Sequence, residues 1–138
     1  MAVIDMQTMR YINLLDRASK VKTTNCFLYN NMIIFAVPRD MMSKAIGPNA
    51  SNIHKIQEML GKKVKIIEEP KDISDLKNFI EDIVAPTKFK SLEVKDTSIL
   101  VTAGSTQVKA ALLGRNKKRY EELNKILQDT FSMELKVI

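Results

Sequence analysis

Two glycines, Gly47 and Gly114, each stand between two segments with helical periodicity, 67 positions apart in the sequence. A glycine at such a turn removes the side chain in front of the next helix. That helix start presents unpaired N–H groups and the positive end of the helix dipole, a combination that can bind a phosphate. An ordinary turn between two helices also needs a glycine where φ is positive. Both interpretations of Gly47 therefore stay open at this point.

The second glycine begins the densest basic run of the chain, whereas the first turn contains no cation and has only Lys44 and Lys55 beside it. Cations at a helix start oppose the helix dipole, which favours an outward role such as contact with an anion. A solvated basic face is the alternative interpretation. The residues of the run are Arg115, Asn116, Lys117, Lys118 and Arg119.

Both turns belong to an internal repeat. Downstream of each glycine, apolar residues recur on one face of a helix with the same spacing. Upstream, Asp5 and Asp72 each precede an apolar stripe and are predicted N-caps, with Met6 and Met9 in the first stripe. We expect the methionines in general to fill the core. The downstream matches place Ile53, Ile56, Met59 and Leu60 over Tyr120, Leu123, Ile126 and Leu127.

Each repeat predicts the order helix, strand, strand, helix, helix, strand, and the two repeats predict domains at residues 1–69 and 71–138. Asn30 and Asn31 predict a tight hairpin turn, and Asp40 is a candidate helix cap. The predicted helices are 6–20, 40–46, 51–60, 73–84, 106–113 and 118–129, and the predicted strands are 26–29, 32–37, 63–69, 88–94, 98–103 and 134–138.

Composition narrows the function classes. The chain has 138 residues with a net charge of +6, which favours an anionic partner. Cys26 and His54 are the single cysteine and histidine, so we expect neither a disulfide nor a Cys/His zinc site, and no other metal or cofactor. His54 is either a solvated helix residue or a phosphate or base contact. No carboxylate pair suits acid–base catalysis, so we expect no enzyme. Without a long apolar segment or signal peptide, we expect a cytoplasmic protein with no membrane partner.

The segment Ala45-Ile46-Gly47-x-x-Ala50-x-x-Ile53, in this order of elements, resembles the type II KH domain. Two such units are similar to the archaeal NusA-like transcription factors. The resemblance covers nearly the whole chain and is most specific in the first loop and in the strand after it. It implies an α+β fold of two tandem type II KH domains, each with a three-stranded mixed sheet.

A KH domain holds about four nucleotides of single-stranded RNA by their backbone at a GxxG loop. The second loop glycine of the family is Ala50 in one repeat and Lys117 in the other, and Pro48 removes one backbone donor. The resemblance also implies an apolar groove floor at Ile46, Ile53 and Ile66, for which a plain core role is the alternative. The implied RNA-binding residues are Lys44, Ile46, Gly47, Pro48, Asn49, Ala50, Ile53, Lys55, Gly114, Arg115, Asn116, Lys117, Lys118 and Arg119.

The expected function is therefore binding of single-stranded RNA, in transcription termination or antitermination by analogy with the family. RNA polymerase and ribosomal components are the candidate protein partners. Two alternatives stay open: an RNA-processing or ribosome-assembly adaptor, and a protein-interaction scaffold whose degenerate loops no longer bind RNA. The sequence does not specify the RNA motif or the oligomeric state.

Overall fold

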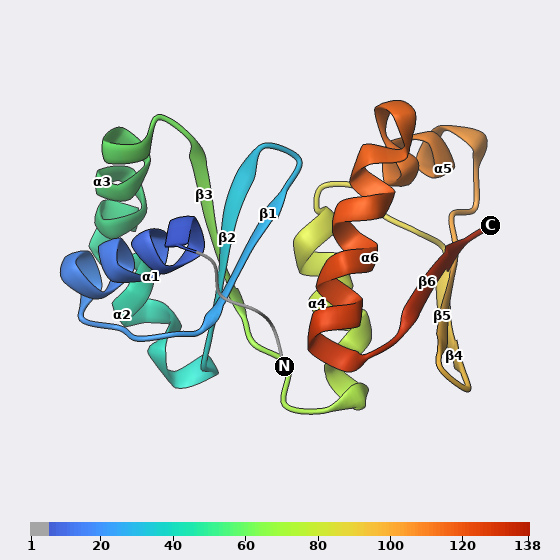
Figure 1. The fold of residues 1–138 in the computed structure, drawn as a ribbon, viewed down its shortest axis with the longest axis horizontal. Helices are drawn as coiled ribbons and strands as arrows, with labels where there is room; N and C mark the ends of the chain where they lie inside the picture. The colour runs from blue at the N-terminus through green and yellow to red at the C-terminus, as the bar shows by residue number, and fades with distance from the viewer. Residues whose placement is uncertain (1–5) are drawn as a thin grey trace. The chain divides into compact units, whose positions relative to one another are not determined.

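The computed structural model describes residues 6–138, so the predicted cap Asp5 lies outside the described residues. These residues form two compact units that meet in sequence between Lys71 and Asp72. Each unit carries helices against a three-stranded sheet (Figure 1). None of the described helices is long and apolar enough to cross a lipid bilayer.

The first unit has a mixed sheet in the order β1-β2-β3, in which β1 and β2 are antiparallel and β2 and β3 parallel. Asn30 and Asn31 both have positive φ, which confirms the predicted hairpin turn. Gly61 ends α3 with φ of 66°. The elements are α1 (Met6–Ser19), β1 (Asn25–Tyr29), β2 (Met32–Val37), η1 (Arg39–Met41), α2 (Met42–Ile46), η2 (Pro48–Ala50), α3 (Ser51–Leu60) and β3 (Lys63–Glu68).

The second unit repeats this topology, with the sheet order β4-β5-β6 and the same alternation of antiparallel and parallel pairs. Asp72 caps its first turn, because the carboxylate accepts a hydrogen bond from the Ser74 N–H. The elements are η3 (Ile73–Asp75), α4 (Leu76–Val84), β4 (Ser91–Lys95), β5 (Ser98–Thr102), α5 (Thr106–Leu113), η4 (Arg115–Lys117), α6 (Lys118–Phe131) and β6 (Glu134–Val137).

The predicted fold class is confirmed, since the described residues form an α+β chain with two three-stranded mixed sheets. The repeated order of helices and strands is also as predicted. The fourth strand begins at Ser91, three residues later than expected. Asp40 does not cap the helix after β2, because Pro38 and Met41 occupy the cap positions of η1 and α2 without any side-chain bond.

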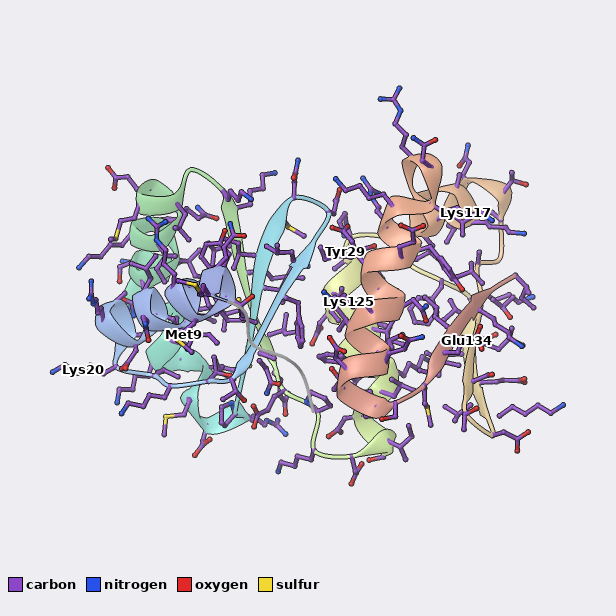
Figure 2. All side chains as sticks on the ribbon, viewed as in Figure 1. Met9, Lys20, Tyr29, Lys117, Lys125 and Glu134 are labelled. Carbon is purple, nitrogen blue, oxygen red and sulfur yellow. The ribbon has the colours of Figure 1, made fainter. Side chains whose placement is uncertain are left out.

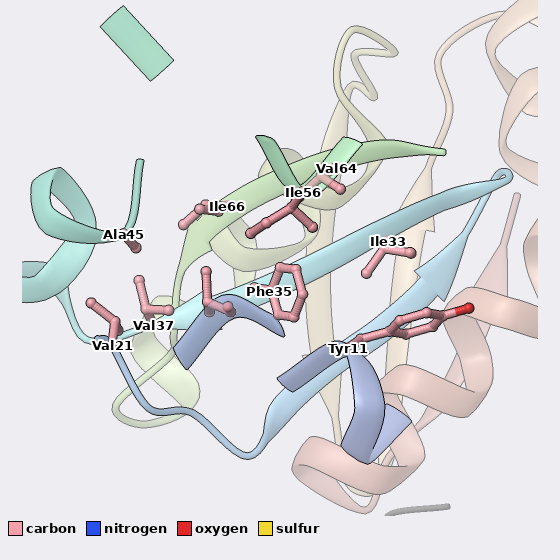
Figure 3. Packing of buried hydrophobic residues seen from close by; sticks show 10 residues of the cluster. Tyr11, Val21, Ile33, Phe35, Val37, Ala45, Ile56, Val64 and Ile66 are labelled. Atoms are coloured by element: carbon pink, nitrogen blue, oxygen red, sulfur yellow. The ribbon is translucent and has the colours of Figure 1, made fainter. Parts of the chain in front are cut away.

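The first core lies between β2, β3 and the three helices of its unit. Ile33, Phe35 and Val37 alternate along β2 and meet Ile56 of α3 and Tyr11 of α1 (Figure 3). Side chains two apart on a strand point to one face, which explains this alternation. Truncating a fully buried phenylalanine such as Phe35 to alanine typically costs about 3–5 kcal/mol. This packing fixes the elements that carry the first glycine loop.

The second unit buries side chains of α4, α5 and α6 and of the strands β5 and β6. Phe79 of α4 is 1% exposed and meets Phe131 of α6 edge to face, with ring centroids 6.0 Å apart. Leu123 and Leu127 of α6 are buried, one helical turn apart. Together they hold α6 in place and so position the second glycine loop at its start.

The prediction that the methionines fill the core is wrong for several of them. Met9 of α1, labelled in Figure 2, is 52% exposed. Tyr11 and Leu15 define the buried face of α1, and Met9 is two residues before Tyr11, roughly 200° around the helix. Met59 is exposed because it stands beside the end of α3, whereas its match Ile126 lies well inside the longer α6. The exposed methionines are Met6, Met9, Met41 and Met59.

Candidate nucleic-acid interface

The two glycine loops have the same backbone conformation. Gly47 has φ 79° and ψ 165°, and Gly114 has φ 73° and ψ 177°. Only glycine occupies this region readily, because a Cβ would collide with the neighbouring backbone. The N–H of each glycine closes the preceding helix on Ser43 and Ala110, at 3.0 and 2.9 Å respectively. The first glycine of each loop is therefore required by its geometry.

The later loop positions follow a left-handed path in both units. Asn49 and Ala50 have φ of 56° and 58°, and Asn116 and Lys117 have φ of 55° and 59°. Glycine is favoured here, but other residues can adopt this conformation at a cost of about 1–2 kcal/mol. Ala50 and Lys117, which stand at the position of the second family glycine, thus share one left-handed conformation. Their presence does not by itself make either loop degenerate.

A side chain from the next helix ties each loop back to the helix before it. Asn52 donates from Nδ2 to the carbonyl of Lys44 at 3.0 Å, and Arg119 donates from Nη1 to the carbonyl of Ala111 at 3.2 Å. The two pairs occupy matching places in the repeat. A Cβ built on Gly47 would lie 2.9 Å from Asn52 Nδ2. Both side chains therefore need the space that a glycine leaves.

Arg119 consequently differs from the cations that precede it. Its side chain is half-buried and engaged in the loop, and a Cβ on Gly114 would lie 2.7 Å from its Cγ. Sequence reasoning grouped it with the surface cations and missed Asn52 altogether. The sequence gives little sign of these hydrogen bonds, because neither asparagine nor arginine is specific to them. Each side chain also donates to a carbonyl eight residues earlier in the chain.

The exposed charges differ between the loops. Arg115, Lys117 and Lys118 are all exposed on the second loop, and Figure 2 shows Lys117 at the turn between α5 and α6. The first loop exposes the neutral Pro48 and Asn49. Lys44 and Lys55 are exposed on the helices that flank it. The second loop therefore has the stronger attraction for phosphate.

The predicted groove floor is divided between surface and core. Ile46 and Ile53 are half-buried at the margin of the first core, where part of each side chain can still meet a ligand. Ile66 is only 7% exposed and belongs to the core. His54 is exposed on α3, as the solvated interpretation expects.

Side chains of α3 and α6 also form hydrogen bonds with the edge strands β3 and β6. The N–H of Val64 on β3 donates to Gln57 Oε1 at 3.0 Å, and the N–H of Leu135 on β6 donates to Asn124 Oδ1 at 2.9 Å. In the second unit, Tyr120 also donates its hydroxyl to the carbonyl of Leu135, at 2.6 Å. The helix and the edge strand thus form the two walls beside each loop.

A hollow of about 550 Å³ lies at the far end of α3 from the first loop. It is a further basic feature that sequence reasoning did not single out. The hairpin turn and the α3–β3 turn come together there and place two exposed lysines at its rim. The lining residues are Asn30, Asn31, Gly61, Lys62 and Lys63.

Sequence comparison with known proteins identifies the family of the chain. The family model for the KH domain matches residues 32–81, which include β2, the first loop, α3 and β3. The chain is 30% identical over 131 residues to the "Probable transcription termination protein NusA" of Methanocaldococcus jannaschii, covering 92% of this chain and 70% of the relative. The chain belongs to the NusA-like family of KH-domain proteins.

A second NusA-like relative covers almost the same span. The protein of the same name from Halococcus morrhuae is 21% identical over 128 residues, which are 91% of this chain and 90% of the relative. The crystal structure of a protein called APE1850 superposes with a TM-score of 0.68 at 24% identity, over 98% of this chain and 99% of that one. That likeness shows the fold. KH domains as a class bind single-stranded RNA, so membership places this chain among RNA-binding proteins.

Proposed function

We propose that this NusA-like chain binds single-stranded RNA at both glycine loops and acts in transcription termination or antitermination, with RNA polymerase as a candidate partner. It is proposed as a binding protein without a catalytic step. The observation that carries the proposal is the repeated loop, in which Gly47 and Gly114 share one glycine-only conformation. The transcriptional process is inferred from the names of the two relatives.

RNA backbone and bases would use different parts of the site. The loop brings the start of α3 or α6 to the sugar–phosphate chain, where backbone N–H groups and the helix dipole favour a negative charge. Arg115, Lys117 and Lys118 add positive charge at the second loop. Beside the first loop, the exposed parts of Ile46 and Ile53 offer apolar contact to unstacked bases. Duplex RNA keeps its bases stacked, so single strands fit this arrangement better.

The backbone strain favours RNA binding over the alternative of a scaffold with degenerate loops. Each loop holds three consecutive or near-consecutive residues at positive φ, including the non-glycine Ala50 and Lys117. Such strain persists where the surrounding structure enforces it and is frequent at ligand sites. Both loops also carry a dedicated side-chain tie from Asn52 or Arg119.

Replacement of Pro48 and Asn49 by aspartate tests the proposal directly. Both side chains are exposed, so the fold should survive, whereas two negative charges repel phosphate. We expect binding of an unstructured RNA 12-mer to weaken at least about tenfold, the loss that corresponds to roughly 1.4 kcal/mol. Fluorescence anisotropy gives the Kd.

The matched control is Thr106→Asp with Gln107→Asp. These residues are also adjacent, neutral and exposed, and they lie at the opposite end of α5 from the second loop. The control adds the same charge, so it measures the general effect of two acids on RNA affinity. Equal losses in the two variants would contradict a role for the first loop. A parental protein that binds no RNA would refute the proposed function as a whole.

A further inference from the structure

The hollow at the far end of α3 gathers positive charge at one point of the first unit. The hairpin turn and the α3–β3 turn lie at the same end of this unit (Figure 1), because Lys63 of β3 pairs in parallel with Met32, the residue after the hairpin turn. Lys62 and Lys63 share the lining of the hollow with the exposed residues Asn30 and Asn31. A concave surface with charge of one sign concentrates counter-ions, and ammonium and amide groups both donate hydrogen bonds. The hollow therefore suits a phosphate group.

The matching place in the second unit has the opposite charge. Glu134 is the first residue of β6 and pairs with Ser98, as Lys63 pairs with Met32 in the first unit. The hairpin turn between β4 and β5 begins with Asp96. Both acidic side chains are exposed. Positive charge at the far end of the helix is thus a property of the first unit and not a consequence of the shared fold.

The hollow is too far from the first glycine loop to act on a phosphate held there. Helix α3 has 10 residues and separates the two places by about 15 Å. Exposed charges are largely screened beyond about 8 Å at physiological ionic strength. Lys62 and Lys63 therefore attract an anion of their own, in the unit whose loop contains no cation.

The walls beside the first loop lead to this hollow. Helix α3 begins after the loop and ends at Leu60, and β3 begins at Lys63. A KH loop engages about four nucleotides, so a longer strand that continues along α3 and β3 carries its next phosphates to the two lysines. A strand of four nucleotides is used up at the loop.

We propose that the hollow binds backbone phosphate of an RNA strand that continues beyond the nucleotides held at the first loop. In the second unit the cations stand at the loop itself, and the acidic far end of α6 repels such a continuation. The first unit therefore has the longer RNA footprint of the two. This inference rests on the proposed RNA binding and adds a second phosphate site to the first unit.

The double substitution Lys62→Ala with Lys63→Ala tests the proposal on oligomers of two lengths. For a uridine 12-mer, the slope of log K against log salt concentration should flatten by up to about 1.4, which corresponds to two phosphate contacts. For a uridine 4-mer, the affinity should stay within about twofold of the parental value, because the loop holds all four nucleotides. Fluorescence anisotropy at several salt concentrations gives both results. An equal loss for the two oligomers would overturn the inference.

The matched control is Lys20→Ala with Lys22→Ala. These two lysines are also exposed, and they precede β1 at the end of the sheet opposite to the hairpin turn. The control removes the same charge and should leave the 12-mer slope nearly unchanged. If the two variants gave the same slope, the hollow would have no phosphate contact, and the inference would be wrong while RNA binding itself stood. A parental chain that binds neither oligomer would refute the proposed function.

The parental protein offers a readout that needs no substitution. The backbone amide signals of Gly61 and Lys62 should move in ¹H–¹⁵N spectra when the 12-mer is bound, because a phosphate then lies in the hollow. The 4-mer should move the Gly47 signal and leave those two in place. The signals of Ser132 and Met133, at the matching turn of the second unit, should stay in place with both oligomers. Unmoved signals of Gly61 and Lys62 in the complex with the 12-mer would overturn the proposal.

Discussion

At the scale of single residues, the first and fourth positions of each loop have different requirements. Gly47 and Gly114 combine positive φ with ψ near 170°, a region that essentially only glycine occupies. Ala50 and Lys117 lie instead in the left-handed helical region, which other residues enter at a modest cost. This distinction explains how residues other than glycine can stand at the fourth position of both loops.

Opposite single substitutions in one loop test this distinction. Gly47→Ala should lower the free energy of unfolding by about 1–3 kcal/mol, since the conformation is strained for alanine and its Cβ would lie 2.7 Å from Ser51 Oγ. Ala50→Gly should raise it by up to about 1 kcal/mol, because relief of the left-handed strain exceeds the added entropy of the unfolded chain. Urea unfolding followed by circular dichroism measures both. Stabilisation by Gly47→Ala, or a large loss from Ala50→Gly, would show that the loop conformation differs from the one described.

At the scale of elements, repeated patterns could be predicted from the sequence and single contacts could not. The recurrence around Gly47 and Gly114 predicted the order of helices and strands, because burial periodicity and turn residues act locally. Helix α3 was predicted with the bounds that the structure shows, Ser51–Leu60. That a residue is apolar did not suffice to predict its burial. Met9 and Met59 were predicted in the core, but Met9 lies on an exposed helix face and Met59 beside an exposed helix end.

In the candidate site, too, the sequence predicted the repeated pattern but not the individual contacts. Glycine spacing located both loops, and the basic run located the exposed cations Arg115, Lys117 and Lys118. The bond from Tyr120 to Leu135 joins residues 15 positions apart and depends on how α6 packs beside β6. Side-chain periodicity contains no information about such a bond.

The uneven charge of the two loop elements predicts uneven salt dependence. Each phosphate neutralised on a single strand adds about 0.7 to the slope of log K against log salt concentration. Changing Arg115, Lys117 and Lys118 to alanine should flatten that slope by up to about 2, whereas Lys44→Ala with Lys55→Ala should flatten it by about 1.4 at most. Arg119 is left unchanged because it supports the loop. Titration of an unstructured RNA at several salt concentrations gives the slopes.

A matched control separates local contact from net charge. Lys77, Lys90 and Lys95 are three exposed lysines of the second unit outside its loop, and their replacement by alanine removes the same total charge. This control should change the slope by much less than one phosphate equivalent. If the loop variant and the control gave the same slope, the basic run would act as a solvated face, and phosphate contact at the second loop would be excluded.

At the scale of the whole molecule, the chain has two units joined by a short connection around Pro70, and each unit carries one loop of the same geometry. Binding at one loop raises the effective concentration of the same RNA at the other, whatever the arrangement of the units. A single KH loop engages about four nucleotides, so a short oligomer can occupy only one loop at a time. The combined affinity of two modest loops can then exceed that of either one.

The affinity for RNA should therefore rise in two stages as the oligomer becomes longer. Unstructured oligomers of about 4–6 nucleotides should bind weakly, and affinity should increase steeply, by tenfold or more, once one strand spans both loops. The Pro48→Asp and Asn49→Asp variant should lose this increase while keeping the affinity of the parental chain for the short oligomers to within a few-fold, because the second loop still binds them. Anisotropy titrations over a series from 4 to 24 nucleotides, at one salt concentration, distinguish the two curves. If the affinity of the parental chain grew only in proportion to the number of overlapping binding sites on the oligomer, the two loops would act independently. If the variant kept the steep increase in affinity, the additional RNA contact of the long oligomers would lie outside the first loop.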